Sequence, residues 1–194
     1  MKNASPREAF TLEDAKTVFN AEWSNPVHKL FSFVAAITGM RYSEILAIRK
    51  ENLHETYINL QDQILNGKPS PLKTKEARKI PVCPELHELL QNRITDGFAF
   101  LEIHDSKASD SLRELLVKIM PEKKKERGYC FHSWRHFFNT YLLSQGVPPI
   151  KVASVMGHST GISSMQEMYT NFTEADYQEV YEVQKKLFEE LKYW

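Results

Sequence analysis

A histidine and an arginine three residues apart are the first side chains in this sequence that suggest chemistry. They stand in the run His132-Ser133-Trp134-Arg135. Residues three apart share one face of a helix, so an imidazole and a guanidinium would lie side by side. Such a pair can bind an anion and move a proton. The structural alternative is a histidine that caps the helix and an arginine that pairs with a carboxylate.

The same region offers a second chemistry, because His132 and His136 are four residues apart and could bind a metal ion. The usual zinc motif on a helix has a glutamate directly after the first histidine, and this chain has Ser133 there. A metal-dependent hydrolase that uses both histidines, with Cys130 as a further ligand, is therefore an alternative that we place well below the others. Our expectation is that the protein has no metal site.

A second guanidinium belongs to Arg41, in the run TGMRYSE at residues 38–44. Gly39 is expected to end a buried helix, which places Arg41 at a helix junction where a loop can direct it into a cleft. Glu44 is close enough in sequence to hold it. The alternative is an ordinary ion pair at the end of a helix.

Two more motifs follow in the last quarter of the chain. Gly157-His158-Ser159 is expected to end a short helix, and Tyr169 comes 11 residues after His158. Taken singly, these would be a capping or core histidine and a core aromatic residue.

Together and in this order, the motifs resemble the catalytic domain of the tyrosine recombinase (phage integrase) family. The resemblance covers residues 9 to 172 and includes Lys73, in the run LKTKEARKIPV. It implies that six residues act on a phosphodiester. Five of them would activate it and Tyr169 would be the nucleophile; the five are Arg41, Lys73, His132, Arg135 and His158.

The function implied by this resemblance is site-specific DNA recombination or integration. DNA strands would be cleaved and rejoined through a 3′-phosphotyrosyl intermediate, without ATP, metal or another cofactor. His132 is the candidate base for the phenol, and Lys73 is the candidate acid for the leaving 5′ oxygen. The expected partners are double-stranded DNA at recombination sites and further copies of the chain, with no membrane involved. The alternatives are a DNA-binding module of the same fold without strand transfer, and DNA relaxation of the type IB topoisomerase kind as a side reaction.

Three features depart from the family pattern. Ser133-Trp134 stands where a carboxylate and a leucine are usual, and the stretch from His158 to Tyr169 is about two residues longer than common. Family members usually carry a helical DNA-binding domain before the catalytic one, and this chain begins almost directly at the catalytic part. We therefore expect a fragment of a longer protein.

Charge is unevenly distributed, although 25 basic and 25 acidic residues give a formal net charge of zero. Residues 61–82 contain five bases and two acids, residues 113–136 contain seven bases and three acids, and residues 172–194 contain six acids and three bases. Basic stretches of this kind can meet a polyanion or can simply be solvated faces. We predict phosphate contacts from Lys68, Lys75, Arg78, Lys123, Lys124 and Lys125, and supporting roles beside the catalytic residues for Glu44 and His136.

Length and composition set the broad class. With 194 residues, 42% hydrophobic and 26% charged, the chain is expected to form one globular domain with a real core. No apolar run approaches the roughly 20 residues of a membrane helix, and no secretory signal is visible. Cys83 and Cys130 are too few for a disulfide scaffold, so a reduced, cytoplasmic protein is expected.

The elements that must position these residues are mainly α-helices with a small antiparallel β-sheet, an α+β fold. Capping signals, turn signals and hydrophobic periodicity predict helices over 11–22, 25–39, 43–50, 84–92, 109–120, 132–145, 149–156 and 163–169, and a last helix from Thr173. Strands are expected at 56–60 and 78–82, with a hairpin turn at Asn66-Gly67. The lysine-rich stretch 121–128 is expected to be a loop.

The predicted organisation is a catalytic domain over residues 1–172 and a C-terminal helix over residues 173–194. The apolar stripe of that helix could pack on its own domain or on a neighbouring subunit. We slightly favour the neighbouring subunit, because recombinases of this type assemble on paired sites.

Overall fold

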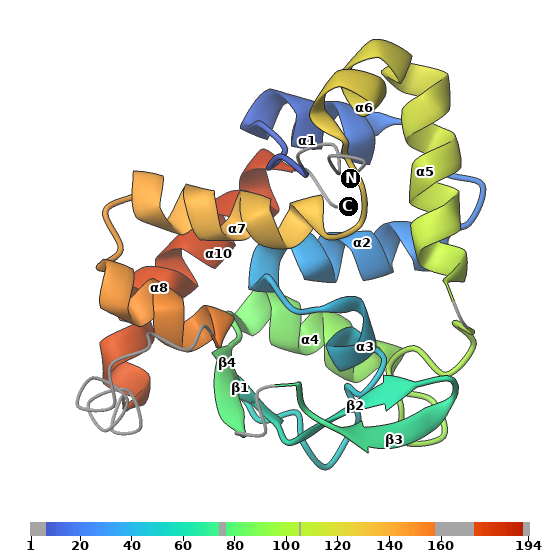
Figure 1. The fold of residues 1–194 in the computed structure, drawn as a ribbon. Coiled ribbons are helices and arrows are strands. Elements are labelled where there is room, and N and C mark those ends of the chain that lie inside the picture. Colours follow the sequence, from blue (N-terminus) through green and yellow to red (C-terminus); the bar gives the residue numbers. More distant parts are fainter. Residues whose placement is uncertain (1–6, 74–76, 105, 158–172, 192–194) are drawn as a thin grey trace.

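The computed structural model describes residues 7–73, 77–104, 106–157 and 173–191. Helices surround a central helix, and two small antiparallel sheets lie at one end (Figure 1), which confirms the expected α+β class. The helices are α1 (Leu12–Asn20), α2 (Pro26–Thr38), α3 (Tyr42–Ile45), α4 (Pro84–Arg93), α5 (Lys107–Ile119), α6 (Pro121–Arg127), α7 (Ser133–Ser144), α8 (Pro149–Met156), the 3-10 turn η1 (Glu174–Tyr177) and α10 (Gln178–Glu190). The strands are β1 (Tyr57–Leu60), β2 (Asp62–Leu65), β3 (Lys68–Pro71) and β4 (Arg78–Pro81).

Local capping signals fix the ends of the first two helices. The Thr11 side chain accepts a hydrogen bond from the Asp14 backbone N–H (3.1 Å), and the Asn25 side chain accepts one from Val27 (2.8 Å). Gly39 ends α2 in the left-handed conformation, with φ of 66°. A Cβ atom at Gly39 would lie 2.8 Å from the Met156 sulfur, so both the conformation and the packing require glycine.

The strands form two separate two-stranded sheets rather than the single sheet expected. β1 pairs with β4, with Ile58 opposite Ile80, and β2 pairs with β3. Asn66 and Gly67 connect β2 to β3 with positive φ angles of 51° and 71°, as the hairpin signal predicts. The β2–β3 hairpin packs against α3 instead of extending the other sheet, and the Ser43 hydroxyl donates to Gln63 (2.7 Å).

Two predictions from the sequence were wrong in extent or in type. The helix expected over 43–50 ends at Ile45, and turns follow it. Residues 121–127, expected to be a loop, form helix α6. Pro121 suits the first turn, lysine, glutamate and arginine are good helix formers, and Gly128 ends the helix at φ of 64°. A helix that is polar on every side has no hydrophobic period, so the pattern did not reveal it.

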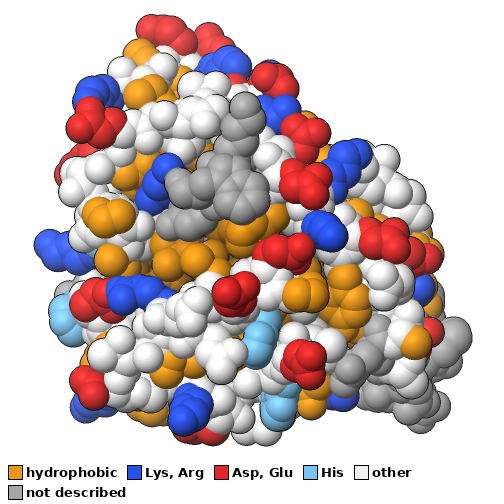
Figure 2. Space-filling model, turned by 180° about the vertical axis from the view of Figure 1, so that it is seen from behind, with side chains coloured by type: hydrophobic (Ala, Val, Ile, Leu, Met, Phe, Trp, Pro, Cys, Tyr) orange, Lys and Arg blue, Asp and Glu red, His pale blue; other side chains and the backbone are white. Residues whose placement is uncertain are grey.

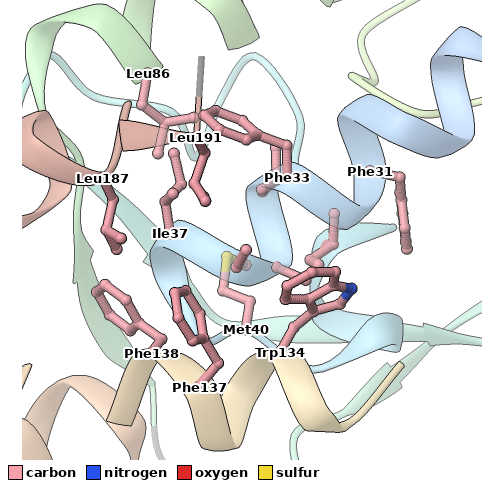
Figure 3. Packing of buried hydrophobic residues seen from close by; sticks show 14 of the residues in the cluster. Phe31, Phe33, Ile37, Met40, Leu86, Trp134, Phe137, Phe138, Leu187 and Leu191 are labelled. Atoms are coloured by element: carbon pink, nitrogen blue, oxygen red, sulfur yellow. The ribbon is translucent and has the colours of Figure 1, made fainter. Parts of the chain in front are cut away.

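The core lies between α2 and α7. Figure 3 shows Trp134, Phe137 and Phe138 of α7 pointing towards α2, where Ile37 and Met40 meet them. These five side chains are at most 2% exposed. The two helices that carry or precede the candidate arginines are therefore held together by close apolar packing.

The described part of α10 packs on its own chain, which is the alternative to docking on a neighbouring subunit. Its residues Val180, Leu187 and Phe188 are buried in the core. Gln184, fully buried, accepts a hydrogen bond from the Cys83 N–H (2.9 Å) and donates to the carbonyls of Ile37 (3.0 Å) and Pro81 (2.8 Å). One side chain thus joins α10 to the end of α2 and to the β4–α4 junction. None of the described helices has the length and apolar character needed to span a bilayer.

We expect Gln184→Met to lower the free energy of unfolding by about 3 kcal/mol, because it keeps the size but leaves three buried backbone groups without a partner. Urea denaturation measures this. Gln178→Met, an exposed position on the same helix, should leave the free energy of unfolding unchanged within about 0.5 kcal/mol. Equal stability of the Gln184 variant and the parent protein would contradict this role.

Candidate active site

Arg41 lies at the junction between α2 and α3. Its guanidinium donates from Nη1 to Glu44 Oε1 (2.7 Å), and its backbone N–H donates to Glu44 Oε2 (2.8 Å). The Arg41 side chain is 22% exposed, whereas that of Glu44 is 1% exposed. The buried carboxylate therefore holds an arginine whose side chain remains partly exposed to solvent.

Glu44 binds a second arginine from a distant part of the chain. Arg78 Nη2 donates to Glu44 Oε2 (2.9 Å), and Arg78 Nε donates to the Val155 carbonyl (3.3 Å) near the end of α8. Burial alone would raise the pKa of Glu44, but Arg78 and Arg41 outweigh it and hold that pKa below its usual range. Glu44 is thus ionised at neutral pH. Nothing local in the sequence revealed this partner, which lies 34 residues away.

Arg135, on the first turn of α7, is the most deeply buried of the three arginines, at 4% exposed. Its Nη1 donates to the Gly39 carbonyl (2.7 Å), and its Nη2 donates to the Met156 carbonyl. Burial and the neighbouring Arg41 lower the pKa of Arg135 to about 9, so it stays cationic at neutral pH. Arg135 ties the C-terminal ends of α2 and α8 to α7.

His132 lies beside the same cations. Partial burial of the imidazole, and then the charges of His136, Arg135 and Arg41, lower the pKa of His132 to about 4. The ring is therefore neutral at pH 7 and can accept a proton. Because the charge of Arg41 acts on both Arg135 and His132, these three predicted site residues are brought together in one electrostatic environment.

Ser133 and Trp134, which depart from the family pattern, stabilise the start of α7. The Ser133 hydroxyl accepts a hydrogen bond from the Cys130 N–H (3.2 Å) where α7 begins. Trp134 is fully buried and stacks on Phe10, with ring centroids 4.0 Å apart, and on Phe19 at 4.9 Å. The pair therefore anchors the start of α7, which carries Arg135.

The other predicted catalytic residues are placed less completely. Lys73 is exposed and comes two residues after the end of β3. His158 and Tyr169, as well as Lys75 among the predicted phosphate contacts, lie outside the described residues.

The remaining predicted phosphate contacts differ in their surroundings. Lys68 and Lys125 are exposed, Lys124 is half-buried, and Lys123 forms an ion pair with the buried Asp14. Arg78 is a buried partner of Glu44 rather than a surface cation, with a side chain 10% exposed. On the face shown in Figure 2, acidic and basic side chains are mixed among apolar ones, so no continuous basic surface covers that side.

The two histidines of the metal alternative are close to each other. The rings of His132 and His136 have centroids 4.8 Å apart and meet edge to face. Within the described ranges, no cluster of three or more His, Cys, Asp or Glu side chains could hold a metal ion. Cys130 is a free cysteine there.

Known proteins of the phage integrase family resemble this chain. The sequence profile of the phage integrase family matches residues 11–176. Tyrosine recombinase XerC from Bacillus pumilus (strain SAFR-032) is 25% identical over 190 residues, which cover 90% of this chain and 57% of that protein. The chain thus spans little more than half the length of that relative.

Solved structures share the fold at lower identity. The integrase from mycobacterium phage Brujita is 19% identical, with a TM-score of 0.63 over 96% of this chain and 60% of that one. The Tn1549 transposon integrase, in complex with a circular intermediate DNA, is 19% identical, with a TM-score of 0.61 over 91% of this chain and 65% of that one. These likenesses confirm the predicted catalytic-domain fold.

The electrostatics predict how His132 titrates. In the DNA-free protein its pKa should lie well below 6.5, and Arg41→Gln should raise it, because that change removes a neighbouring cation. Arg113→Gln removes a cation that does not act on His132 and should leave its pKa unchanged. NMR titration of the imidazole Cε1–H measures all three proteins. A parent pKa at or above 6.5 would refute the arrangement of cations described here.

Proposed function

Because this chain belongs to the phage integrase family of tyrosine recombinases, we propose that it cleaves and rejoins DNA strands in site-specific recombination or integration. One observation carries the proposal: the Arg41 guanidinium at the α2–α3 junction and the Arg135 guanidinium and His132 imidazole at the start of α7 share one electrostatic environment, beside the buried Glu44 carboxylate. A phosphodiester is an anion that resists attack by another anion. Fixed cations that bind its nonbridging oxygens lower that barrier.

We assign the anion-binding role to Arg41 and Arg135. A guanidinium has five N–H donors, and the two carbonyls bound by Arg135 engage only part of them. Arg41 is partly exposed, and its bond to Glu44 likewise engages only part of its donors. Forked donors of this kind suit the nonbridging oxygens of a phosphate.

The proposed nucleophile is Tyr169, which needs activation because a phenol has a pKa near 10. His132 is neutral at pH 7 and can take the phenolic proton. Its low pKa makes it a weak base in the DNA-free protein. A bound phosphate adds negative charge beside the ring and would raise that pKa towards the range where proton transfer is efficient. His158 is assigned a further hydrogen bond to the phosphate.

In the proposed reaction, the phenolic oxygen forms a bond to phosphorus and the bond to the 5′ oxygen breaks. Lys73, exposed near the hairpin, supplies the proton that the leaving oxygen needs. The 5′ hydroxyl of another strand then attacks the 3′-phosphotyrosyl link and releases the phenol. Each step exchanges one phosphoester bond for another, so no ATP is consumed.

DNA and further copies of the chain are the proposed partners. Lys68 and Lys125 are exposed cations that can contact phosphates and set position more than sequence. Assembly of several copies on paired sites belongs to the same proposal. Docking of the apolar stripe of α10 on another copy would require its release, because Leu187 and Phe188 are buried within their own chain.

The central test is Tyr169→Phe, which removes the attacking oxygen and little else. A pool of randomised, nicked duplexes is incubated with the full chain, and adducts that resist SDS are selected and sequenced. We expect the variant to lose the adduct by at least about 1,000-fold while DNA affinity stays within about threefold, since the oxygen forms the covalent bond. Tyr57→Phe, a tyrosine on β1, is the matched control and should form the adduct normally.

Persistence of the adduct in the Tyr169 variant would show that the nucleophile is a different residue. Binding of DNA by the parent protein with no adduct on any duplex would instead support the DNA-binding module.

Lys73→Ala tests the proton donor. Cleavage at an ordinary 5′ oxygen should slow by about 100-fold or more, but far less at a 5′ sulfur, because a thiolate leaves without a proton. Single-turnover rates on the two substrates give the ratio. Lys68→Ala removes a cation from the neighbouring strand β3 and should affect both substrates equally. Equal slowing of both substrates by Lys73→Ala would reject the acid role.

A further inference from the structure

Arg78 occupies a place that a surface phosphate contact would not. It begins β4, and its side chain is 10% exposed. One nitrogen of the fork binds Glu44, another binds the Val155 carbonyl, and Gly157 lies against the same guanidinium. A Cβ atom at Gly157 would stand 2.8 Å from Arg78 Nε.

These contacts join three segments that the proposed reaction uses. Glu44 also binds Arg41, from which it accepts two hydrogen bonds. β4 begins five residues after Lys73 in the chain. Val155 and Gly157 form the end of α8, after which the chain continues to His158 and Tyr169.

A forked side chain suits this position better than any other cation. Arginine presents separate N–H groups in a rigid plane, so it can hold a carboxylate and a carbonyl at a fixed separation. Lysine offers a single ammonium on a flexible stem and cannot reproduce that geometry. Gly157 adds a second constraint, because its φ of 60° and the adjacent guanidinium both exclude a side chain.

We propose that Arg78 is a positioning residue, whose fork sets the distance between the Arg41–Glu44 turn and the end of α8. It thereby fixes Gly157, the point from which the segment with the nucleophile departs. The inference rests on the proposed function and adds a residue to it. A displacement of about 1 Å at a reacting group can cost about 100-fold in rate, so loss of the fork should affect cleavage more than binding.

The alternative role for Arg78 is direct contact with the scissile phosphate. Arg78 Nη1 is buried and has no hydrogen-bond partner among the described residues, so a donor is available for such a contact. The two roles differ in one respect. A group that neutralises the phosphate matters less when the phosphate carries no charge, whereas a positioning group matters equally.

The test compares Arg78→Lys with Arg49→Lys in the full chain, on the nicked duplex that the parent protein cleaves. Arg49 is a matched control, because its side chain is 16% exposed and forms an ion pair (2.8 Å) with Asp62, the first residue of β2. We expect Arg78→Lys to slow single-turnover cleavage by 10- to 100-fold, with DNA affinity within about twofold. Arg49→Lys should change neither quantity by more than about twofold.

The same rates are then measured on a duplex with a neutral methylphosphonate at the scissile position. The factor lost by Arg78→Lys should be the same as on the charged phosphate. A loss that disappears on the neutral linkage would overturn the positioning role in favour of direct contact. Cleavage equal to that of the parent on both substrates would overturn the inference altogether.

A second pair of variants and a readout without DNA keep the inference testable. Gly157→Ala and Gly146→Ala both place a side chain at positive φ, but only the first would meet Arg78, since nothing lies within 4 Å at Gly146. Only Gly157→Ala should show the cleavage defect. Hydrogen exchange of the Gly157 amide, which donates to Ser154, should become at least about fivefold faster in Arg78→Lys and stay unchanged in Arg49→Lys.

Unchanged exchange in Arg78→Lys would refute the positioning role of Arg78, whether or not the parent protein cleaves DNA. Faster exchange together with a parent protein that forms no adduct would show that Arg78 holds the end of α8, and would reject the proposed function instead.

Discussion

One buried carboxylate governs the arrangement of charge in this protein. Glu44 accepts hydrogen bonds from Arg41 and Arg78, and its charge also acts on Arg135. Three guanidiniums around one carboxylate leave an excess of positive charge in a partly buried place, which by itself is unfavourable. Arginine cannot relieve this by losing a proton at neutral pH. In the proposed function, a bound phosphate would supply the missing negative charge.

Carbonyl groups at helix ends accept further hydrogen bonds from two of these arginines. Arg135 donates to the carbonyls of Gly39 and Met156, and Arg78 donates to that of Val155. The last carbonyls of a helix have no partner within the helix and carry the negative end of its dipole. The carbonyls at the ends of α2 and α8 therefore accept hydrogen bonds from the buried guanidiniums, and the guanidiniums supply the partners that these carbonyls lack within their helices. This mutual arrangement also explains why Gly39 and Gly157, which end the two helices, lie so close to the site.

The sequence predicted those features whose causes are local. The Asn25-Pro26 start of α2, its end at Gly39 and the Asn66-Gly67 turn each depend on residues within a few positions of one another. The pairing of Arg41 with Glu44, three residues apart, was within reach for the same reason.

Features with distant causes were missed. α6 has no apolar stripe, and its ion pair from Lys123 reaches back 109 residues to Asp14. The burial of Arg78 depends on Glu44 and on the end of α8, which no local pattern links to β4. Its residue type and its basic neighbours suggested a surface cation, whereas tertiary packing places it inside.

The core and the chemistry meet in α7, where Trp134 lies between the two residues of the histidine–arginine motif. Its indole N–H is buried and has no hydrogen-bond partner among the described residues, which costs about 1–3 kcal/mol. Burial of about 200 Å² of indole surface contributes about 5 kcal/mol, so the burial of apolar surface outweighs the lost hydrogen bond. Stacking on Phe10 and Phe19 fixes the rotation of α7 about its axis. Since successive residues of a helix point about 100° apart, that same rotation determines where Arg135 points. The aromatic packing around α7 is therefore part of the site as much as of the core.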